Sequence, residues 1–342
     1  MKIALVRVPA EHTTAFYYER AIETLGHSVV VFRDASEIPD TAIFDLVLVV
    51  DPCFAGFWSL TSSKCTTAAI LIDVHRNLKR RLILAQFCDH VFVAQPDFLQ
   101  AFKEEGHRSV HWLPLGCDPE VHFVPEQERK IPVGFVGNFG APGHTRHNVL
   151  THVLAQFETN ETARFYGPAE MGRTYSQSRI VFNKSIGNEV NMRVFEAMAS
   201  GALLVTDRIG NGLADLATEG EHYIGYDTAE EAVEKIKHYL SCEPARARIA
   251  AAGQALVLDR HRYQDRLAQV LDCVEQAGQR PIAPARNASK TQIAQWRAES
   301  GRSLGISPGA AFDLVRQGLP LSAYPHLLSG LSRWRRQRRQ RH

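Results

Sequence analysis

Polar and charged residues are concentrated between Ile180 and Gly201, in the segment IVFNKSIGNEVNMRVFEAMASG. Lys184 directly follows a short apolar run, and Arg193 and Glu196 come later in the same segment. A cationic side chain beside free backbone amides suits the binding of phosphate, whereas a carboxylate accepts hydrogen bonds from hydroxyl groups. The segment therefore predicts a site for a ligand that carries both kinds of group.

The elements that must position these residues form one βαβ unit. The pattern predicts a strand over Ile180–Asn183, a polar loop, a helix over Glu189–Ser200 and a second strand over Ala202–Asp207. Asn188 is the expected N-cap of the helix, and Glu189 is expected in its first turn, where the helix dipole favours a carboxylate. Polar loops at the carboxyl ends of parallel strands are the usual ligand sites of such folds.

Bulk composition places few limits on the partners of the chain. It has 342 residues, 45% of them hydrophobic, and a net charge of +2, which suits two domains of ordinary size plus an extension. The six cysteines show neither a C-x-x-C pair nor a zinc-ligand spacing, so we expect them to be reduced and structural, as in the cytoplasm. Lys2 leads straight into a predicted strand, which indicates no signal peptide, and no apolar run is long enough to cross a membrane.

The N-terminal part alternates between predicted strands and helices, which indicates a layered α/β domain with a parallel sheet. Its predicted helices are Thr13–Leu25, Leu78–Phe87 and Asp97–Glu105. Its predicted strands are Ile3–Val8, Ser28–Phe32, Leu46–Val50, Ala69–Val74, His90–Ala94 and Val110–Leu115.

A second α/β block follows a break in the pattern near Gly116–Pro119. Its predicted strands are Val133–Val136, Arg164–Tyr166, Ile180–Phe182, Ala202–Thr206 and Tyr223–Tyr226. The sequence contains neither a P-loop nor, in the first βα turn, the glycine fingerprint of dinucleotide-binding domains. We predict a first domain over 1–118, a linker over 119–131, a second domain over 132–278 and an extension over 279–342 that ends in a basic tail. We expect this extension to be partly helical or disordered, and either loosely packed or dependent on a partner.

Several motifs resemble those of one enzyme family. The stretch LPLGCDPEVHF, from Leu113 to Phe123, resembles the interdomain linker of GT-B glycosyltransferases, and Val136-Gly137-Asn138 resembles the loop that opens their second domain. The segment from Asn183 to Asp207 is similar to the donor-binding segment of family-4-like glycosyltransferases, in particular the subgroup related to the spore-maturation protein CgeB. The resemblance covers about 65–275 and implies a GT-B fold, in which two Rossmann-like domains with parallel sheets face each other across a cleft.

The resemblance also implies which residues bind a nucleotide-sugar donor, with UDP as the expected nucleotide. Glu196 matches the glutamate that holds the ribose hydroxyls; the alternative is a surface glutamate of a helix. Lys184, Arg193 and Arg146 are the candidates for stabilising the leaving diphosphate, and Gly137 is expected to let the main chain approach it. The full set of expected donor-site residues is Gly137, Asn138, Arg146, Lys184, Ser185, Asn188, Glu189, Asn191, Met192, Arg193 and Glu196.

One position departs from the pattern of the wider family. There, a second acidic residue lies eight positions before the ribose-binding glutamate, but here that position is Asn188 and the acid is Glu189. Whether Glu189 contacts the sugar or only the helix dipole is therefore open. No D-x-D motif occurs in a plausible strand context, so we expect catalysis without a metal or a further cofactor.

Asp73 and His75 are the candidate catalytic residues on the acceptor side, because they end a predicted buried strand. A histidine has a pKa near working pH and can act as a general base; His12 is the rival for this role. In a retaining reaction, which the family resemblance implies, the leaving phosphate could take the proton instead.

The arginine-rich tail over 333–341 has three interpretations: flexible surface charge, contact with an anionic membrane, or binding of nucleic acid. Contact with the inner membrane face would suit a lipid-linked acceptor, and specific binding of nucleic acid is not expected. The sequence as a whole predicts a cytoplasmic glycosyltransferase that transfers a sugar to a hydroxyl acceptor. The alternatives are a non-catalytic GT-B protein with a structural or regulatory role and a nucleotide-sugar epimerase.

Overall fold

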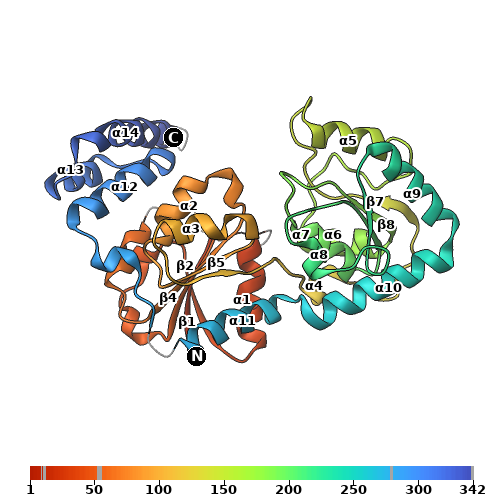
Figure 1. The fold of residues 1–342 in the computed structure, drawn as a ribbon, viewed down its shortest axis with the longest axis horizontal. Helices are drawn as coiled ribbons and strands as arrows, with labels where there is room; N and C mark the ends of the chain where they lie inside the picture. The colour runs from red at the N-terminus through yellow and green to blue at the C-terminus, as the bar shows by residue number, and fades with distance from the viewer. Residues whose placement is uncertain (9, 11–12, 52–55, 278–279, 340–342) are drawn as a thin grey trace. The chain divides into compact units, whose positions relative to one another are not determined.

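The computed structural model describes residues 1–8, 10, 13–51, 56–277 and 280–339 (Figure 1). It divides into two compact units: Met1–Leu113 together with Val270–His342, and Pro114–Gln269. The boundary differs from the predicted linker over 119–131 because the chain around Cys117 pairs with the second unit. The Cys117 amide donates to the His261 carbonyl at 2.9 Å, and the Tyr263 amide donates to the Cys117 carbonyl at 2.9 Å.

The first unit contains a six-stranded parallel sheet in the order β2-β1-β3-β4-β5-β6. The strands are β1 (Lys2–Val6), β2 (Ser28–Phe32), β3 (Leu46–Val50), β4 (Thr66–Leu71), β5 (His90–Val93) and β6 (Val110–Trp112). All six predicted strands are therefore present. The sequence predicts that the strand starting near Ala69 continues to Val74, but β4 ends at Leu71. Asp73 has a left-handed φ of 50°, which a strand cannot accommodate.

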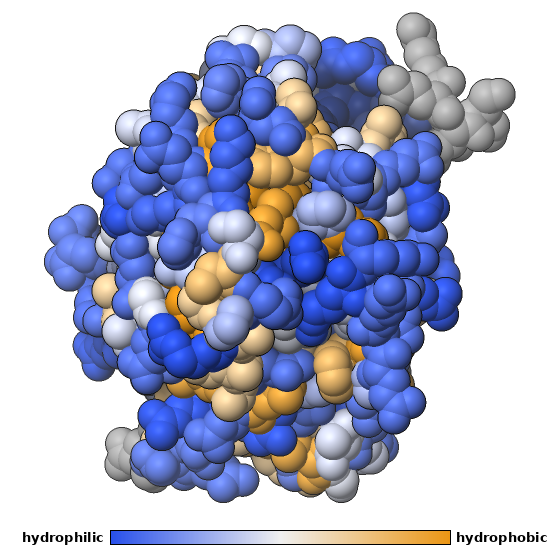
Figure 2. Space-filling view, turned by 90° about the vertical axis from the view of Figure 1, so that its right-hand side faces the viewer, coloured by the Kyte–Doolittle hydropathy of each residue, from blue (hydrophilic) through white to orange (hydrophobic). Residues whose placement is uncertain are grey.

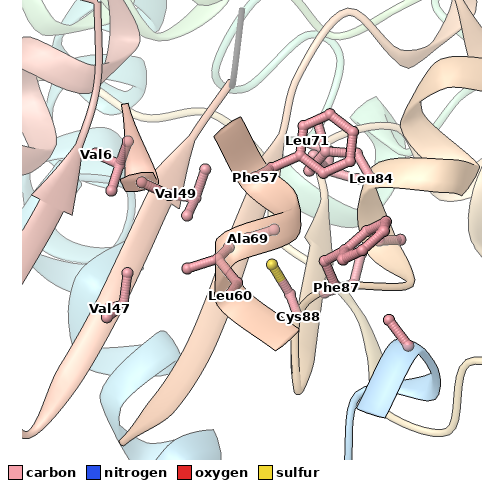
Figure 3. Close-up of a cluster of buried hydrophobic side chains, with 14 of the residues drawn as sticks. Val6, Val47, Val49, Phe57, Leu60, Ala69, Leu71, Leu84, Phe87 and Cys88 are labelled. Carbon is pink, nitrogen blue, oxygen red and sulfur yellow. The ribbon is translucent and has the colours of Figure 1, made fainter. Parts of the chain in front are cut away.

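Helices and 3-10 turns cover this sheet. They are α1 (Thr14–Thr24), η1 (Ala35–Glu37), η2 (Thr41–Ile43), η3 (Gly56–Ser62), η4 (Val74–Arg76), α2 (Leu78–Ala85), η5 (Pro96–Phe98) and α3 (Leu99–Glu104). Figure 3 shows part of the core, in which Phe57 of η3 lies near Leu71 of β4 and Leu84 of α2, and Leu60 of η3 belongs to the same buried cluster. The continuous apolar strands predicted a sheet buried on both faces, and β3 is indeed buried along its whole length.

The second unit contains a four-stranded parallel sheet in the order β10-β9-β8-β7. The strands are β7 (Ile131–Gly134), β8 (Ser178–Asn183), β9 (Leu203–Asp207) and β10 (Ile224–Tyr226). The predicted strand Arg164–Tyr166 is wrong. The Arg164 guanidinium lies over the Tyr166 ring at 4.1 Å and pairs with Glu170 at 2.5 Å, while Phe165 is 73% exposed. These local contacts hold the segment at the surface, where no sheet partner buries its apolar side chain.

The helices of the second unit surround a core in which residues of all four strands pack together. They are α4 (Pro119–His122), α5 (Thr145–Leu154), α6 (Pro168–Ser176), α7 (Met192–Ala199), α8 (Leu213–Leu216), α9 (Ala229–Ser241) and α10 (Glu243–Arg260). Helix α11 (Tyr263–Gln276) begins in this unit and continues into the first. The face of the molecule drawn in Figure 2 is mainly hydrophilic, with smaller apolar areas between the polar side chains. Among the described residues, no helix is both long and apolar enough to span a membrane. The five described cysteines are free, and Cys53 lies outside the described residues.

The C-terminal segment, for which the sequence predicts a partly helical or disordered extension over 279–342, forms several helices in the described residues. It forms η6 (Pro284–Asn287), α12 (Lys290–Leu304), α13 (Pro308–Arg316), η7 (Leu321–Ala323) and α14 (Tyr324–Arg339), and its three helices lie together in Figure 1. These helices share a small buried cluster of their own. Ala285, Ile293 and Trp296 join the core of the first unit, so the segment is an integral part of that unit.

A buried carboxylate fastens the start of this segment to the sheet. Asp89, whose side chain is 0% exposed, accepts hydrogen bonds from Arg280 Nε at 2.9 Å and Arg286 Nη2 at 3.2 Å. It also accepts from the amides of Thr67 and Ala283, at 2.9 and 3.0 Å. The Asp89 side chain therefore connects the amino-terminal ends of β4 and β5 to the C-terminal segment.

We expect Asp89→Ala to lower the free energy of unfolding by about 3 kcal/mol, because two arginines would lose their counter-charge. Denaturant unfolding followed by circular dichroism measures the loss. Asp97→Ala, at an exposed position of the same unit, is the matched control and should change stability by less than about 0.5 kcal/mol. Equal effects of the two substitutions would show that the Asp89 network does not anchor the segment.

Candidate functional site

The loop between β8 and α7 reverses direction before the helix begins. Gly187 and Asn188 both have left-handed backbones, with φ of 65° and 62°. Helix α7 therefore starts at Met192 with Asn191 as its N-cap, and the predictions that Asn188 caps the helix and that Glu189 lies in its first turn are wrong. Instead, the Asn188 side-chain oxygen accepts a hydrogen bond from the Gly210 amide at 2.9 Å, which joins this loop to the one that follows β9.

Glu189 lies in this loop and is only 5% exposed. Because it precedes the helix, it does not occupy the first turn where a helix dipole would act on its carboxylate. An interaction of Glu189 with the helix dipole alone is therefore excluded. A contact of Glu189 with the sugar stays a prediction.

Lys184 and Ser185 both bind the carboxylate that ends the neighbouring strand. Lys184 Nζ lies 2.6 Å from Asp207 Oδ2, and the Ser185 amide and hydroxyl donate to Asp207 at 2.8 and 2.5 Å. Strands β8 and β9 are adjacent and parallel, so their carboxyl ends bring these residues together. Asp207 thus holds the ammonium group of Lys184 at the end of the sheet, and the Lys184 side chain is 20% exposed.

Arg193 projects from the first turn of α7 into a set of neutral acceptors. Its guanidinium donates to Asn183 Oδ1 at 2.8 Å, to the Tyr175 hydroxyl at 3.1 Å and to the Val136 carbonyl at 2.6 Å. It also lies over the Phe135 ring, 4.5 Å from the centroid. Because these partners are uncharged, they orient the guanidinium without neutralising it, which leaves its charge available to an anion.

Gly137 is required by the position of Arg193. A Cβ atom at Gly137 would lie 2.3 Å from Arg193 Nη2, and the backbone φ of 138° disfavours any side chain. The glycine thus allows the loop after β7 to lie directly against the guanidinium. Asn191 adds a further contact, since its side-chain amide donates to Asn183 Oδ1 at 3.2 Å.

Arg146, on α5, is the second arginine beside the β7 loop. Its guanidinium donates twice to the Asn138 carbonyl, at 3.2 and 3.1 Å, while the Asn138 side chain accepts from the Gly140 amide at 2.6 Å. Burial, and next the nearby charge of Arg193, lower the pKa of Arg146 to about 10. Arg146 and Arg193 repel each other across a partly buried loop, so an anion bound between them would be stabilised by both charges.

Glu196 is buried, which excludes the alternative that it is a surface glutamate. Its side chain on α7 is 8% exposed, and burial raises its pKa to about 7. His122 Nε2 lies 4.0 Å from Glu196 Oε1, but burial lowers the pKa of His122 to about 3, so the imidazole is neutral and no ion pair forms at neutral pH. A carboxyl group half-ionised near pH 7 thus lies one turn beyond Met192 and Arg193.

We expect the titration of Glu196 to contribute to the pH dependence of stability. Its pKa is about 7 in the folded protein, against an ordinary value of 4.5, so the folded state holds this proton more tightly than the unfolded chain. The free energy of unfolding should therefore fall as pH rises from about 4.5 to about 7 and then level off. Relative to Glu196→Gln, which cannot titrate, the wild type should lose on the order of 2 kcal/mol over this range. Urea unfolding of both proteins at several pH values tests this, and a constant difference between them would contradict it.

The two acceptor-side candidates lie in the first unit. Asp73 precedes η4 and pairs with Arg76 at 3.1 Å, and His75 lies within η4. Burial lowers the pKa of His75, with Asp73 opposing the effect, so the imidazole is neutral at pH 7, as a general base must be. His12, the rival candidate, lies outside the described residues.

Several residues of this site were not predicted. Asp207 closes the motif that carried the family resemblance, and its place at a strand end was a visible signal. Tyr175 lies on α6, a helix that the sequence pattern did not indicate, and Asn183 joins Arg193 to Asn191. Their roles depend on contacts between segments distant in sequence, which no local pattern encodes.

Comparisons with known proteins bear on the fold and on the family of the second unit. A family model described as glycosyl transferase-like matches 125–272. No curated protein matches the chain in sequence. Among solved structures, HepE of Anabaena in complex with UDP and glucose is 16% identical, with a TM-score of 0.59 over 80% of this chain and 99% of that one. Sucrose-phosphate synthase from Thermosynechococcus elongatus is 12% identical, with a TM-score of 0.57 over 80% and 98%. A glycosyltransferase from Rickettsia africae is 13% identical, with a TM-score of 0.58 over the same shares.

These likenesses extend through both units, and they confirm the predicted GT-B fold class. The match over 125–272 identifies a glycosyltransferase-like domain within the second unit and its continuation into α11. The site described above lies in that domain.

Proposed function

We propose that the protein is a glycosyltransferase that moves a sugar from a UDP-sugar to a hydroxyl acceptor. One observation carries the proposal: Lys184, Arg193 and Arg146 gather at the loops that follow β7 and β8, and the buried carboxylate of Glu196 lies one turn along α7. UDP is supported as the nucleotide by the solved structures of HepE with UDP and with UDP-glucose.

In this proposal the diphosphate binds at the ends of β7 and β8. The Lys184 ammonium and the guanidinium groups of Arg193 and Arg146 supply the charge that stabilises the departing nucleoside diphosphate. Glu196 accepts hydrogen bonds from the ribose hydroxyls, and Glu189 or the backbone at Gly187 and Asn188 contacts the sugar. The cationic side chains take the place of a metal ion, which supports the expectation of a metal-independent reaction.

The acceptor side belongs to the first unit in this proposal. A retaining reaction lets the leaving phosphate accept the proton, while His75 and Asp73 orient the acceptor hydroxyl. The motif from Asn183 to Asp207 supports a relationship to the CgeB subgroup. Exposed Arg333, Arg335 and Arg336 on α14 support contact of the tail with an anionic membrane from the cytoplasmic side; the last residues of the predicted tail, 340–341, lie outside the described residues.

Product analysis with UDP-glucose tests the proposed activity. The purified protein is incubated with UDP-glucose and a panel of sugar, lipid-linked and protein acceptors, and nucleotides and glycans are separated by chromatography and mass spectrometry. The proposal expects release of UDP together with a glycosylated acceptor or, without an acceptor, slow hydrolysis. Conversion of UDP-glucose to another UDP-hexose would instead identify an epimerase. Failure to bind UDP, GDP and dTDP, measured by calorimetry, would favour a non-catalytic protein.

A further inference from the structure

A basic pocket lies in the first unit, and none of the residues assigned above to the donor lines it. It has a volume of about 340 Å³ and is formed where α2 meets α12 and α14. Its lining includes four cationic side chains, one carboxylate and one histidine. The cations are Lys79, Arg80, Arg302 and Arg333, the carboxylate is that of Glu299, and the histidine is His326.

The sources of these charges are far apart in the sequence. Lys79 and Arg80 come from the first turn of α2, whereas Arg302 lies in the last turn of α12 and Arg333 lies on α14. Like charges from three helices repel one another, and Glu299 already pairs with Lys79 at 3.1 Å. Bringing Arg302 and Arg333 to the same pocket therefore costs free energy that a bound anion would recover.

The end of α2 adds to this field. Asn77 caps the helix by accepting a hydrogen bond from the Arg80 amide at 3.3 Å, and Asn77 also lines the pocket. The positive end of the eight-residue helix α2 is thus directed toward the same space as the cations. From position 314 to the end of the chain, the sequence contains no Asp or Glu. Helix α14 therefore brings no acidic side chain that could neutralise the cations of the pocket.

We propose that this pocket binds a phosphate ester, with two or more phosphate oxygens held between Arg302 and Arg333 on one side and Lys79 and Arg80 on the other. Guanidinium groups bind phosphate with two parallel hydrogen bonds, and the volume accommodates a diphosphate. The phosphate could belong to a lipid headgroup or to a free phosphorylated compound. The site does not depend on sugar transfer by the second unit.

Calorimetric titration of the full-length protein with inorganic pyrophosphate tests the proposal. Saturating UDP is included so that any donor site is already filled. The double variant Arg302→Gln/Arg333→Gln should weaken pyrophosphate binding at least tenfold. The matched control Arg33→Gln/Arg316→Gln removes the same charge from exposed positions of the first unit outside the pocket, and it should leave binding unchanged. Circular dichroism and thermal unfolding verify that both variants are folded.

A vesicle assay separates the two sources of phosphate. Vesicles of phosphatidylcholine containing phosphatidic acid are compared with vesicles containing phosphatidylserine, with and without pyrophosphate. Selective binding to phosphatidic acid that pyrophosphate displaces supports a lipid headgroup as the ligand, whereas pyrophosphate binding without vesicle binding supports a free phosphate compound. The proposal is overturned if the wild type does not bind pyrophosphate, or if both double variants lose affinity equally. Because the variants Arg302→Gln and Arg333→Gln assign the binding to the first unit, both tests remain informative even if UDP does not bind.

Discussion

Replacing Lys184 with methionine is expected to lower kcat/KM for sugar transfer by about 100-fold or more. The substitution keeps the apolar stem of the side chain but removes the ammonium that Asp207 holds at the end of β8. Removing one donor that stabilises developing negative charge typically costs a factor of about 10²–10³. The loss should appear mainly in kcat, because charge builds up on the diphosphate only as the glycosidic bond breaks.

The fold should tolerate this change. Asp207 keeps the hydrogen bonds from the amide and hydroxyl of Ser185, so the thermal unfolding temperature should fall by only a few degrees. Lys237→Met, at an exposed position of α9 in the same unit, is the control and should retain full activity. Undiminished turnover by the folded Lys184→Met protein would show that this lysine does not act on the leaving group.

Replacing Glu196 with alanine is expected to raise the dissociation constant of UDP by about 10- to 100-fold. A buried carboxylate that accepts hydrogen bonds from two ribose hydroxyls contributes about 1–3 kcal/mol. Because the pKa of Glu196 is about 7, the effect should be largest at pH 8, where the carboxylate is ionised. Calorimetric titration with UDP at pH 8 and pH 6 measures it.

A nucleotide analogue makes this test specific for the ribose contact. The wild type should bind 2′-deoxy-UDP more weakly than UDP, whereas Glu196→Ala should bind the two nucleotides equally, because the partner of the missing hydroxyl is already gone. Glu234→Ala, an exposed position on α9, should behave like the wild type. If Glu196→Ala still distinguishes the two nucleotides as the wild type does, the ribose assignment is wrong.

Much of the fold could be predicted because its signals are local. Continuous apolar runs such as Leu46–Val50 mark strands buried on both faces, and their alternation with amphipathic segments indicates a parallel α/β sheet. The donor segment was found for the same reason, since a strand, a polar loop and a helix follow one another within Ile180–Gly201.

The details that were missed depend on backbone geometry or on distant contacts. Helix α7 starts three residues later than predicted because Asn191 has an extended backbone, with φ of −87° and ψ of 171°, and sequence periodicity alone does not report backbone angles. The packing of the C-terminal segment depends on Asp89, which meets Arg280 and Arg286 only after folding. Arg164–Tyr166 has strand-forming residues, but the outer edge of β7 pairs with Thr159 instead, in an isolated bridge at Val133.

The central claim is that the second unit binds a nucleoside diphosphate at the loops following β7 and β8. Hydrogen–deuterium exchange of the full-length protein, with and without saturating UDP, tests it most directly. The account predicts slower exchange at 137–140 and at 184–192 and in the first turn of α7, with the same protection reduced in Glu196→Ala at equal UDP concentration. Protection confined to other segments, or no protection at a UDP concentration that saturates binding, would contradict it.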